Sequence, residues 1–489
     1  MKIIVLITLS IIFFNFSYSQ QEEDNVITRS IANFTNDPSL QNAAVSFHAI
    51  DLNTNKTLAS YNENMSLPPA SIMKLYTTAL SFEALGAYYK PETKLYISGE
   101  IDSLGVLNGD IWIKGGGDPT LGSAYFNREG DERLFFLYWA DAVLSAGIKK
   151  VNGRVIADGS DFGYKGAPEG WSWGDLGNYY GAGPSGCVIF DNMTYLDYQT
   201  SAELSDSTII ACIDPYVHNM KVRNEVKTSS SQKDNAYIYG APYSYDRIAV
   251  GSLPYNKESF KVKASIPDPE LQLAQEFQFE LGQYIEIEKP PIGVRNLFYN
   301  KEISIDYSKK QLIYTEEGKM INTIAYWTNL RSINLFAEQL LCLIGYEKYG
   351  SGSSESGIAY SQNYWDRIVG NGLNISDGSG LSRKNSSSAS NFTSMLKHMS
   401  KSNNFDSFKK TLPIAGLTGT LSRVCRGQAA HGKMYAKSGT MNRIKAYSGY
   451  IDSSSGKKIA FALIVNNHTC SNAVLLRKME TVFNSMANY

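Results

Sequence analysis

Ser71 and Lys74 supply a hydroxyl and an amine three positions apart, the groups that acyl-transfer chemistry needs. They follow Pro68-Pro69-Ala70 at the expected start of an apolar helix. Residues i and i+3 share one face of a helix, so the amine can reach the serine oxygen. A lysine kept neutral by desolvation and nearby cations can accept the serine proton. The N–H groups at the helix start suit an oxyanion. This spacing recurs along the chain, but at Ser71 it opens a helix that we expect to be buried.

Two further short patterns add hydroxyl, amide and amine groups. Ser332-Ile333-Asn334 precedes an apolar helical run. Its simplest interpretation is a helix cap; alternatively, the hydroxyl relays a proton while the amide fixes Lys74 and a substrate peptide. Lys437-Ser438-Gly439-Thr440 contains the one K-[ST]-G of the chain, in a strand-like stretch. A lysine and a hydroxyl at a strand edge suit an anionic carboxylate, and glycine lets another backbone approach closely. Taken alone, this pattern is more typical of an ordinary exposed strand.

The composition excludes several other function classes. The 489 residues are 43% hydrophobic, enough for sizeable cores, and this length predicts about two to four domains. The 46 Lys+Arg against 47 Asp+Glu give a net charge of −1, so nothing favours nucleic-acid binding. The five cysteines and five histidines are scattered without metal-ligand spacing, so we expect no metal and no cofactor. Whether Cys187 and Cys212 form a disulfide is left open by the sequence.

The N-terminus predicts export. Lys2 precedes the apolar run Ile3–Phe16, and Ser17-Tyr18-Ser19 then places small residues at alternate positions. We interpret residues 1–19 as a signal peptide and expect a periplasmic protein. A membrane anchor would need roughly 20 apolar residues, more than this run offers, so no stable membrane span is expected.

The two ends of the chain share one pattern, and the middle has another. Strands are predicted at residues 44–50 and 56–61 and again at 446–451 and 458–465, with helices beside them. The middle, roughly residues 93–310, holds short β-like runs and glycine turns. The fold class is therefore predicted as α/β, an antiparallel sheet built from both ends of the chain, with mostly β material inserted between them.

The three short patterns occur in the order S-x-x-K, S-x-N and K-[ST]-G, the signature of serine penicillin-interacting enzymes. Further stretches extend the likeness over nearly the whole mature chain. On these motifs the sequence resembles the low-molecular-mass class C penicillin-binding proteins, the D-alanyl-D-alanine carboxypeptidase/endopeptidase family. The stretches are Gly115-Gly116-Gly117-Asp118-Pro119-Thr120-Leu121, Gly170-Trp171-Ser172-Trp173-Gly174-Asp175 and Asp377-Gly378-Ser379-Gly380-Leu381-Ser382-Arg383.

The resemblance implies a penicillin-binding-protein/β-lactamase-like transpeptidase fold with a large insert. It implies a catalytic domain at residues 20–92 and 311–489, insert domain II at 93–205 and 288–310, and a nested insert domain III at 206–287.

The same resemblance implies roles for the motif residues. Ser71 would be the acylated nucleophile and Lys74 its base, while Ser332 and Lys437 help to move or stabilise the proton; which group takes the proton first stays open. Asn334 would contact the substrate amide. Ser438, with Lys437, would hold the terminal carboxylate beside Gly439, and the N–H groups of Ser71 and Thr440 would form the oxyanion hole.

Four other positions match residues that line the family's pocket for the stem-peptide side chain. Asp175 would suit an ammonium group and Arg383 a carboxylate, with Tyr180 as the aromatic wall and Asn442 at the rim. Without the family match, Asp175 and Arg383 are equally typical of a structural ion pair or turn.

The expected function is a serine D-alanyl-D-alanine carboxypeptidase that also cleaves cross-links as an endopeptidase. It would act on peptidoglycan stem peptides and be acylated by β-lactam antibiotics. The alternatives are a serine β-lactamase or esterase with the same residues, and a catalytically inactive cell-wall-binding protein. The oligomeric state is not determined by the sequence.

Overall fold

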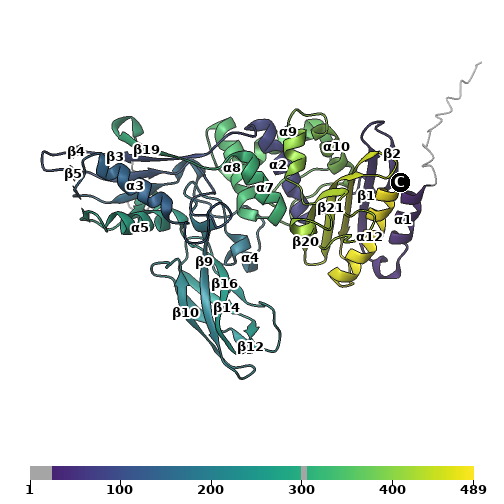
Figure 1. Cartoon of the computed structure of the whole chain (residues 1–489), viewed down its shortest axis with the longest axis horizontal. Helices are drawn as coiled ribbons and strands as arrows, with labels where there is room; N and C mark the ends of the chain where they lie inside the picture. Colours follow the sequence, from purple (N-terminus) through teal and green to yellow (C-terminus); the bar gives the residue numbers. More distant parts are fainter. Residues whose placement is uncertain (1–24, 299–304) are drawn as a thin grey trace, which may run out of the picture.

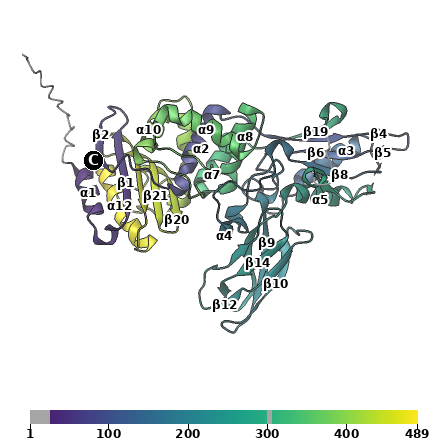
Figure 2. The ribbon, with the colours of Figure 1, turned by 180° about the vertical axis from the view of Figure 1, so that it is seen from behind.

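The computed structural model describes residues 25–298 and 305–489, so the predicted signal peptide at residues 1–19 lies outside the described residues. The molecule has three parts (Figures 1 and 2). One part combines a sheet with helices and contains both ends of the described chain. A second part extends from it along the long axis, and a third, rich in strands, projects from the junction at an angle.

The first part is built on a five-stranded antiparallel sheet in the order β2-β1-β22-β21-β20. Its strands are β2 (Thr57–Tyr61), β1 (Ala44–Asp51), β22 (Lys458–Asn466), β21 (Ile444–Asp452) and β20 (Met434–Met441). The first strand of the chain pairs with the last one over its whole length. The prediction that the two ends share one sheet within an α/β fold is confirmed.

Helices cover both faces of this sheet. On one face, α1 (Val26–Thr35) and α12 (Asn472–Asn488) enclose a core that includes Phe461 and Phe483. In the described part of the chain, the other face of the sheet is covered by six helices, whose buried side chains form a second core with those of that face. These helices are α2 (Lys74–Ala84), α7 (Ile321–Arg331), α8 (Asn334–Tyr349), α9 (Ser354–Val369), α10 (Ala389–Met399) and α11 (Phe405–Lys410).

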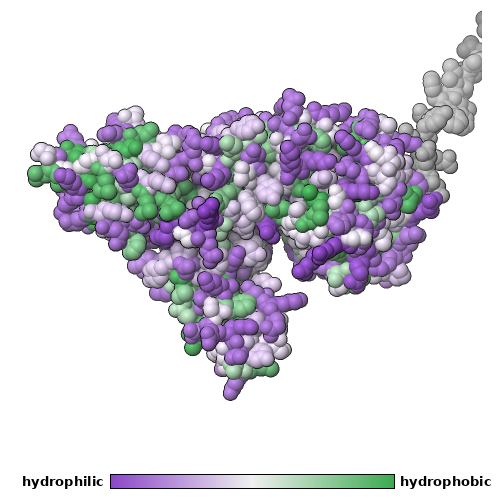
Figure 3. Space-filling model, in the orientation of Figure 1, coloured by the Kyte–Doolittle hydropathy of each residue, from purple (hydrophilic) through white to green (hydrophobic). Residues whose placement is uncertain are grey.

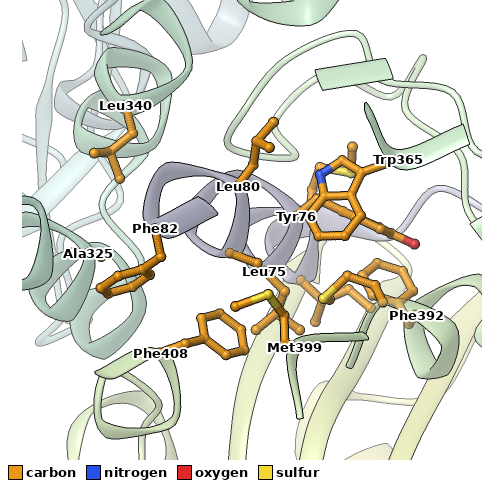
Figure 4. Close-up of a cluster of buried hydrophobic side chains, with 14 of the residues drawn as sticks. Leu75, Tyr76, Leu80, Phe82, Ala325, Leu340, Trp365, Phe392, Met399 and Phe408 are labelled. Atoms are coloured by element: carbon orange, nitrogen blue, oxygen red, sulfur yellow. The ribbon is translucent and has the colours of Figure 1, made fainter. Parts of the chain in front are cut away.

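Helix α2 runs through the middle of the second core, and every residue from Lys74 to Phe82 is buried. Leu75, Tyr76 and Phe82 point in different directions from it toward the neighbouring helices (Figure 4). The Tyr76 ring lies 5.5 Å from that of Trp365 and 4.8 Å from that of Phe392. A helix that is enclosed on all sides is held rigidly, which fixes the side chains at its start.

Domain II is the second part of the molecule. Its main sheet has the order β18-β8-β6-β3-β19 and a smaller one the order β17-β7-β5-β4. Two helices, α3 (Leu134–Ser145) and α5 (Pro269–Leu281), contribute to its core. The strands are β3 (Glu92–Ile97), β4 (Glu100–Ile101), β5 (Val106–Asn108), β6 (Ile111–Lys114), β7 (Lys150–Val151), β8 (Val155–Asp158), β17 (Glu286–Ile287), β18 (Ile292–Gly293) and β19 (Gln311–Glu317).

Domain III is the projecting third part and has a small core of its own around Leu196, Tyr198 and Leu253. Its sheets have the orders β10-β9-β16, β11-β14-β13 and β12-β15. The strands are β9 (Met193–Thr200), β10 (Thr208–Asp214), β11 (Lys221–Asn224), β12 (Lys227–Ser229), β13 (Tyr237–Tyr239), β14 (Asp246–Val250), β15 (Ser252–Pro254) and β16 (Lys257–Ser265).

The strand pairing corrects the domain boundaries expected from the sequence. β9 belongs to domain III, not to domain II, because it pairs with β16. α5 lies inside the range expected for domain III but packs in the core of domain II. β19 was expected in the catalytic domain, yet it pairs with β3 in the domain II sheet. Each difference comes from a contact between segments far apart in the chain, which local patterns do not reveal.

The visible surface is mostly hydrophilic, with apolar patches at the end that contains α3 and β19 (Figure 3). Leu137, Tyr138 and Leu312 are among the exposed apolar residues of those elements. Within residues 25–298 and 305–489, no helix is both long and apolar enough to cross a membrane. The same residues hold no cluster of ligands that would bind a metal ion.

All five cysteines are free, and the buried ones should be inert. Cys212 is exposed, Cys470 is partly exposed, and Cys187, Cys342 and Cys425 are buried. Burial raises the pKa of the Cys425 thiol to about 12 and that of the Cys187 thiol well above its ordinary value. We predict that a thiol reagent labels Cys212 and then Cys470 in the native protein, and the other three only after unfolding. A Cys187–Cys212 disulfide, detected by peptide mapping, would contradict this.

Candidate active site

Ser71 lies at the entrance of the buried helix. It belongs to a short 3-10 helix, η2 (Ala70–Met73), which leads directly into α2, whose first residue is Lys74. The sequence predicted a single helix beginning at Ser71. In the structure, the first turn is instead a tighter 3-10 helix, and the α-helix begins at Lys74. Ser71 is half-buried, and the Lys74 Nζ lies 3.3 Å from its Oγ. The predicted pairing of amine and hydroxyl is therefore present.

Lys74 is fully buried and makes three polar contacts. Its Nζ donates hydrogen bonds of 2.7 Å to Asn334 Oδ1 and 2.7 Å to the carbonyl oxygen of Ser379. Both are acceptors only, and a neutral amine has just two N–H groups. With both N–H groups used, the lone pair of the amine is left for the Ser71 hydroxyl. Burial lowers the pKa of Lys74 to about 7, against the opposing charges of Asp377 and Glu338.

A second buried lysine faces the same site. Lys437 on β20 donates hydrogen bonds of 2.8 Å to Ser332 Oγ and 2.7 Å to the carbonyl oxygen of Ser438. Burial and the nearby charge of Lys74 lower the pKa of Lys437 well below its ordinary value. Ser332 links α7 to α8 with a left-handed backbone, φ 62°, which turns its hydroxyl toward the strand. Ser71 with Lys74 and Ser332 with Lys437 thus form two pairs of a serine and a lysine, and the second pair joins segments 105 positions apart in the sequence.

Asn334, the first residue of α8, connects these pairs to the insert. Its Oδ1 accepts from Lys74, and its Nδ2 donates a 2.8 Å hydrogen bond to the carbonyl oxygen of Tyr180. The amide cannot rotate without breaking both bonds. The sequence prediction that Asn334 fixes Lys74 agrees with this geometry.

Strand β20 lies at the edge of the sheet and passes very close to η2. A Cβ on Gly439 would lie 2.8 Å from the Pro69 carbonyl oxygen and 3.0 Å from the Ser71 nitrogen. Only glycine permits this approach, as the sequence predicted. The half-buried Ser438 contacts Thr420 Oγ1 at 2.8 Å through its Oγ, and Thr440 is exposed. The strand edge beside Ser71 is therefore lined with hydroxyl groups.

A pair of buried carboxylates supports the loop that faces Lys74, a role that the sequence analysis missed. Glu338 accepts hydrogen bonds from the N–H groups of Gly378 and Ser379, at 3.0 and 2.8 Å. Asp377 accepts from the N–H groups of Gly380 and Ser382 within the same loop. Together they fix the carbonyl oxygen that binds Lys74. The available signal was the acidic Glu338 among the apolar residues of α8, which include Phe336, Ala337 and Leu340.

The insert contributes the next residues of the site. The Trp171 Nε1 donates a 2.9 Å hydrogen bond to Asp377 Oδ2, so the insert is attached to the loop that supports Lys74. Asp175 lies in the short helix α4 (Trp173–Leu176). Its carboxylate accepts a hydrogen bond from the Tyr180 hydroxyl, and the positive charge of Arg383 is close enough to lower its pKa. Burial raises the pKa of Asp175. The structure thus brings Asp175, Tyr180 and Arg383 together.

Asn442 has a different location. It lies in the exposed turn between β20 and β21, where it lines a surface pocket with Arg443 and His468. The structure does not group it with Asp175 and Arg383.

A serine beside a buried lysine, at the start of a helix that packs against an antiparallel sheet, is the arrangement of a class of serine peptidases in which a lysine activates the nucleophile. The model of the D-Ala-D-Ala carboxypeptidase 3 (S13) family matches residues 27–489. The chain belongs to this family and is a serine-type D-alanyl-D-alanine carboxypeptidase. The resemblance stated from the motifs is confirmed.

Individual relatives span most of the chain. The protein is 26% identical over 451 residues to a D-alanyl-D-alanine carboxypeptidase of Actinomadura sp. (strain R39), covering 88% of this chain and 79% of that protein. It is 24% identical over 472 residues to D-alanyl-D-alanine carboxypeptidase DacB of Haemophilus influenzae, with 91% of each covered. The crystal structure of penicillin binding protein 4 from the same organism superposes with a TM-score of 0.77 at 22% identity, covering 94% of this chain and 99% of that one.

We predict that Gly439→Ala slows acylation of the enzyme at least tenfold. The added methyl group would push β20 away from η2, and displacement of reacting groups by about 1 Å costs up to ~100-fold in rate. The second-order rate constant for acylation by a fluorescent penicillin measures this, with the thermal unfolding midpoint as the control for folding. An unchanged acylation rate would show that the close approach is not needed.

Proposed function

We propose that the protein removes the terminal D-alanine from peptidoglycan stem peptides through an acyl-enzyme on Ser71. The observation that supports this is the arrangement around Lys74: a buried amine with both N–H groups bound to fixed acceptors and its third contact to the Ser71 Oγ. Such an amine can take the serine proton near neutral pH, and when protonated it keeps all three contacts as a donor.

Acylation follows from this arrangement. The Ser71 Oγ attacks the carbonyl carbon of the D-Ala-D-Ala bond as its proton passes to Lys74 Nζ, and the N–H groups of Ser71 and Thr440 stabilise the oxyanion. The C–N bond then breaks, and the proton held by Lys74 passes to the leaving D-alanine nitrogen by way of the hydroxyl of Ser332, backed by Lys437, so that Lys74 is neutral again. A water molecule hydrolyses the ester, releases the shortened peptide and restores the Ser71 hydroxyl.

Substrate binding in this proposal uses the residues around the strand edge. Asn334 contacts a peptide amide of the substrate, while Ser438, together with Lys437 and beside Gly439, holds the terminal carboxylate. Asp175, Tyr180 and Arg383 receive the side chain of the stem peptide: the carboxylate of Asp175 suits an ammonium group, and the guanidinium of Arg383 suits a carboxylate.

We further propose that the protein cleaves D-Ala cross-links, that β-lactams acylate it and that it acts in the periplasm. The bond broken in a cross-linked dimer has the same D-alanyl carbonyl, so the same acylation makes the protein an endopeptidase. A relative, penicillin binding protein 4 of Haemophilus influenzae, has been crystallised in complex with a β-lactam. Export by the N-terminal segment would place the enzyme beside its substrate, the peptidoglycan.

We predict that the purified protein releases free D-alanine from pentapeptide muropeptides, and that it also splits cross-linked dimers. Ser71→Ala should abolish both reactions while leaving the unfolding temperature within a few degrees, because Ser71 is at the surface of the core. Chromatography of the muropeptides measures both products. Monomer cleavage without dimer cleavage would reject the endopeptidase part alone.

The same preparation tests the two alternatives. A stoichiometric penicilloyl adduct on the intact protein, absent from Ser71→Ala, would reject an inactive cell-wall-binding protein. Rapid turnover of nitrocefin without D-alanine release would instead identify a β-lactamase and contradict our proposal.

We predict that acylation depends on a group with a pKa of about 7. Lys74 must be neutral to accept the serine proton, and burial lowers its pKa to about 7. The rate constant should therefore fall about tenfold per pH unit below neutrality and reach a plateau above it. Acylation by a β-lactam, measured from about pH 5 to about pH 9, reports this step. A rate that rises as the pH falls would exclude Lys74 as the base.

A further inference from the structure

Lys445 is a buried lysine beside the site that the proposed mechanism does not use. It lies on β21 directly opposite Thr440 of β20 and is 8% exposed. Its Nζ is 3.4 Å from Thr440 Oγ1 and 5.5 Å from the centre of the Tyr447 ring. The side chain is thus directed at the strand edge that is lined with hydroxyl groups.

The ammonium group of Lys445 has no counter-ion in the described part of the chain. No carboxylate forms an ion pair with it there, and burial alone lowers its pKa, with no acidic group acting against it. By contrast, Lys457, which is more exposed, pairs with Asp51 at 3.0 Å. Burying a charge without a partner is unfavourable, so an anion that arrives near Lys445 would be stabilised there.

The pleat of β20 decides which groups share this side of the strand. Alternate residues point the same way, so Thr440 and Ser438 lie on the side of Lys445, whereas Lys437 points to Ser332 on the other. Ser438 is opposite Tyr447, just as Thr440 is opposite Lys445. One cation and two hydroxyl groups therefore meet at one strip of the strand edge.

The contact with Lys445 also fixes the direction of the Thr440 hydroxyl. An ammonium group can only donate, so the Thr440 oxygen accepts from it. The hydrogen of the hydroxyl is then free to be donated outward, and Thr440 is exposed. A carboxylate is the complementary acceptor at that position.

We propose that Lys445 is a positioning residue of the carboxylate subsite: it orients the Thr440 hydroxyl toward the terminal carboxylate of the substrate, and that carboxylate supplies the missing counter-charge. This inference rests on the proposed function, in which the same strand edge binds the terminal D-alanine. The ligand class is a C-terminal carboxylate, as in a peptide that ends in D-alanine or in a β-lactam acid.

The test compares a β-lactam that has a free carboxylate with the same molecule lacking that charge. Benzylpenicillin and its methyl ester are reacted with the wild-type enzyme, Lys445→Met, Lys445→Arg and Lys433→Met, and acylation is followed by intact mass. Lys433→Met is the matched control, because it removes a charge at the other end of the strand, where Lys433 contacts Ser454. Thermal unfolding of each variant checks folding.

We expect Lys445→Met to slow acylation by benzylpenicillin about tenfold and to leave acylation by the methyl ester unchanged. Lys445→Arg should restore most of the rate, and Lys433→Met should behave as wild type. With a D-alanine-terminated peptide, Lys445→Met should raise KM more than it lowers kcat.

Equal slowing with acid and ester would show a merely structural role and overturn the inference, as would unchanged rates with both. Failure of the wild-type enzyme to react with either compound would overturn the proposed function itself, so the two failures are distinguishable.

Discussion

The active-site region depends on one constraint, the burial of two lysine side chains in the protein interior. Lys74 and Lys437 are both fully buried, and the charge of one lowers the pKa of the other. A shift of the Lys74 pKa from 10.5 to about 7 corresponds to roughly 5 kcal/mol. Because the folded pKa is the lower one, this cost is full below about pH 7 and disappears as the pH rises past the unfolded pKa. The enzyme gives up stability here in exchange for a basic amine at neutral pH.

The surroundings of Lys74 explain how such an amine is kept in place. Every residue of α2 from Lys74 to Phe82 is buried, so the lysine backbone cannot move toward water. Asn334 and the loop at Ser379 provide acceptors in fixed positions, and the buried carboxylates Glu338 and Asp377 hold that loop through its N–H groups. The same carboxylates favour the charged form of Lys74, which keeps its pKa from falling further. The pKa of Lys74 is therefore set by two opposing effects, burial and nearby negative charge.

Much of the catalytic part was predictable because its signals are local. The strands at the two ends show apolar runs bounded by turns, and Ser71, Lys74, Ser332 and Lys437 stand in short motifs whose chemistry is readable from residue type. The domain boundaries were not predictable in this way, since β3 meets β19 and β9 meets β16 only in the folded chain. Glu338 was missed because the loop that it holds, at Gly378 and Ser379, is distant in the sequence. Lys445 was missed because its position opposite Thr440 depends on the register of the β20–β21 hairpin, which residue types alone do not give.

The edge strand β20 shows how one element can separate two tasks. Its side chains alternate, so Lys437 reaches Ser332, while Ser438 and Thr440 turn to the opposite side with Lys445. Gly439 lies between Ser438 and Thr440 and lets Ser71 approach the strand. A substrate lying along this edge would meet a base at one side of its peptide bond and hydroxyl donors at its carboxylate. Because side chains alternate along a strand with a period of two residues, this one strand presents Lys437 on one side and Ser438 and Thr440 on the other.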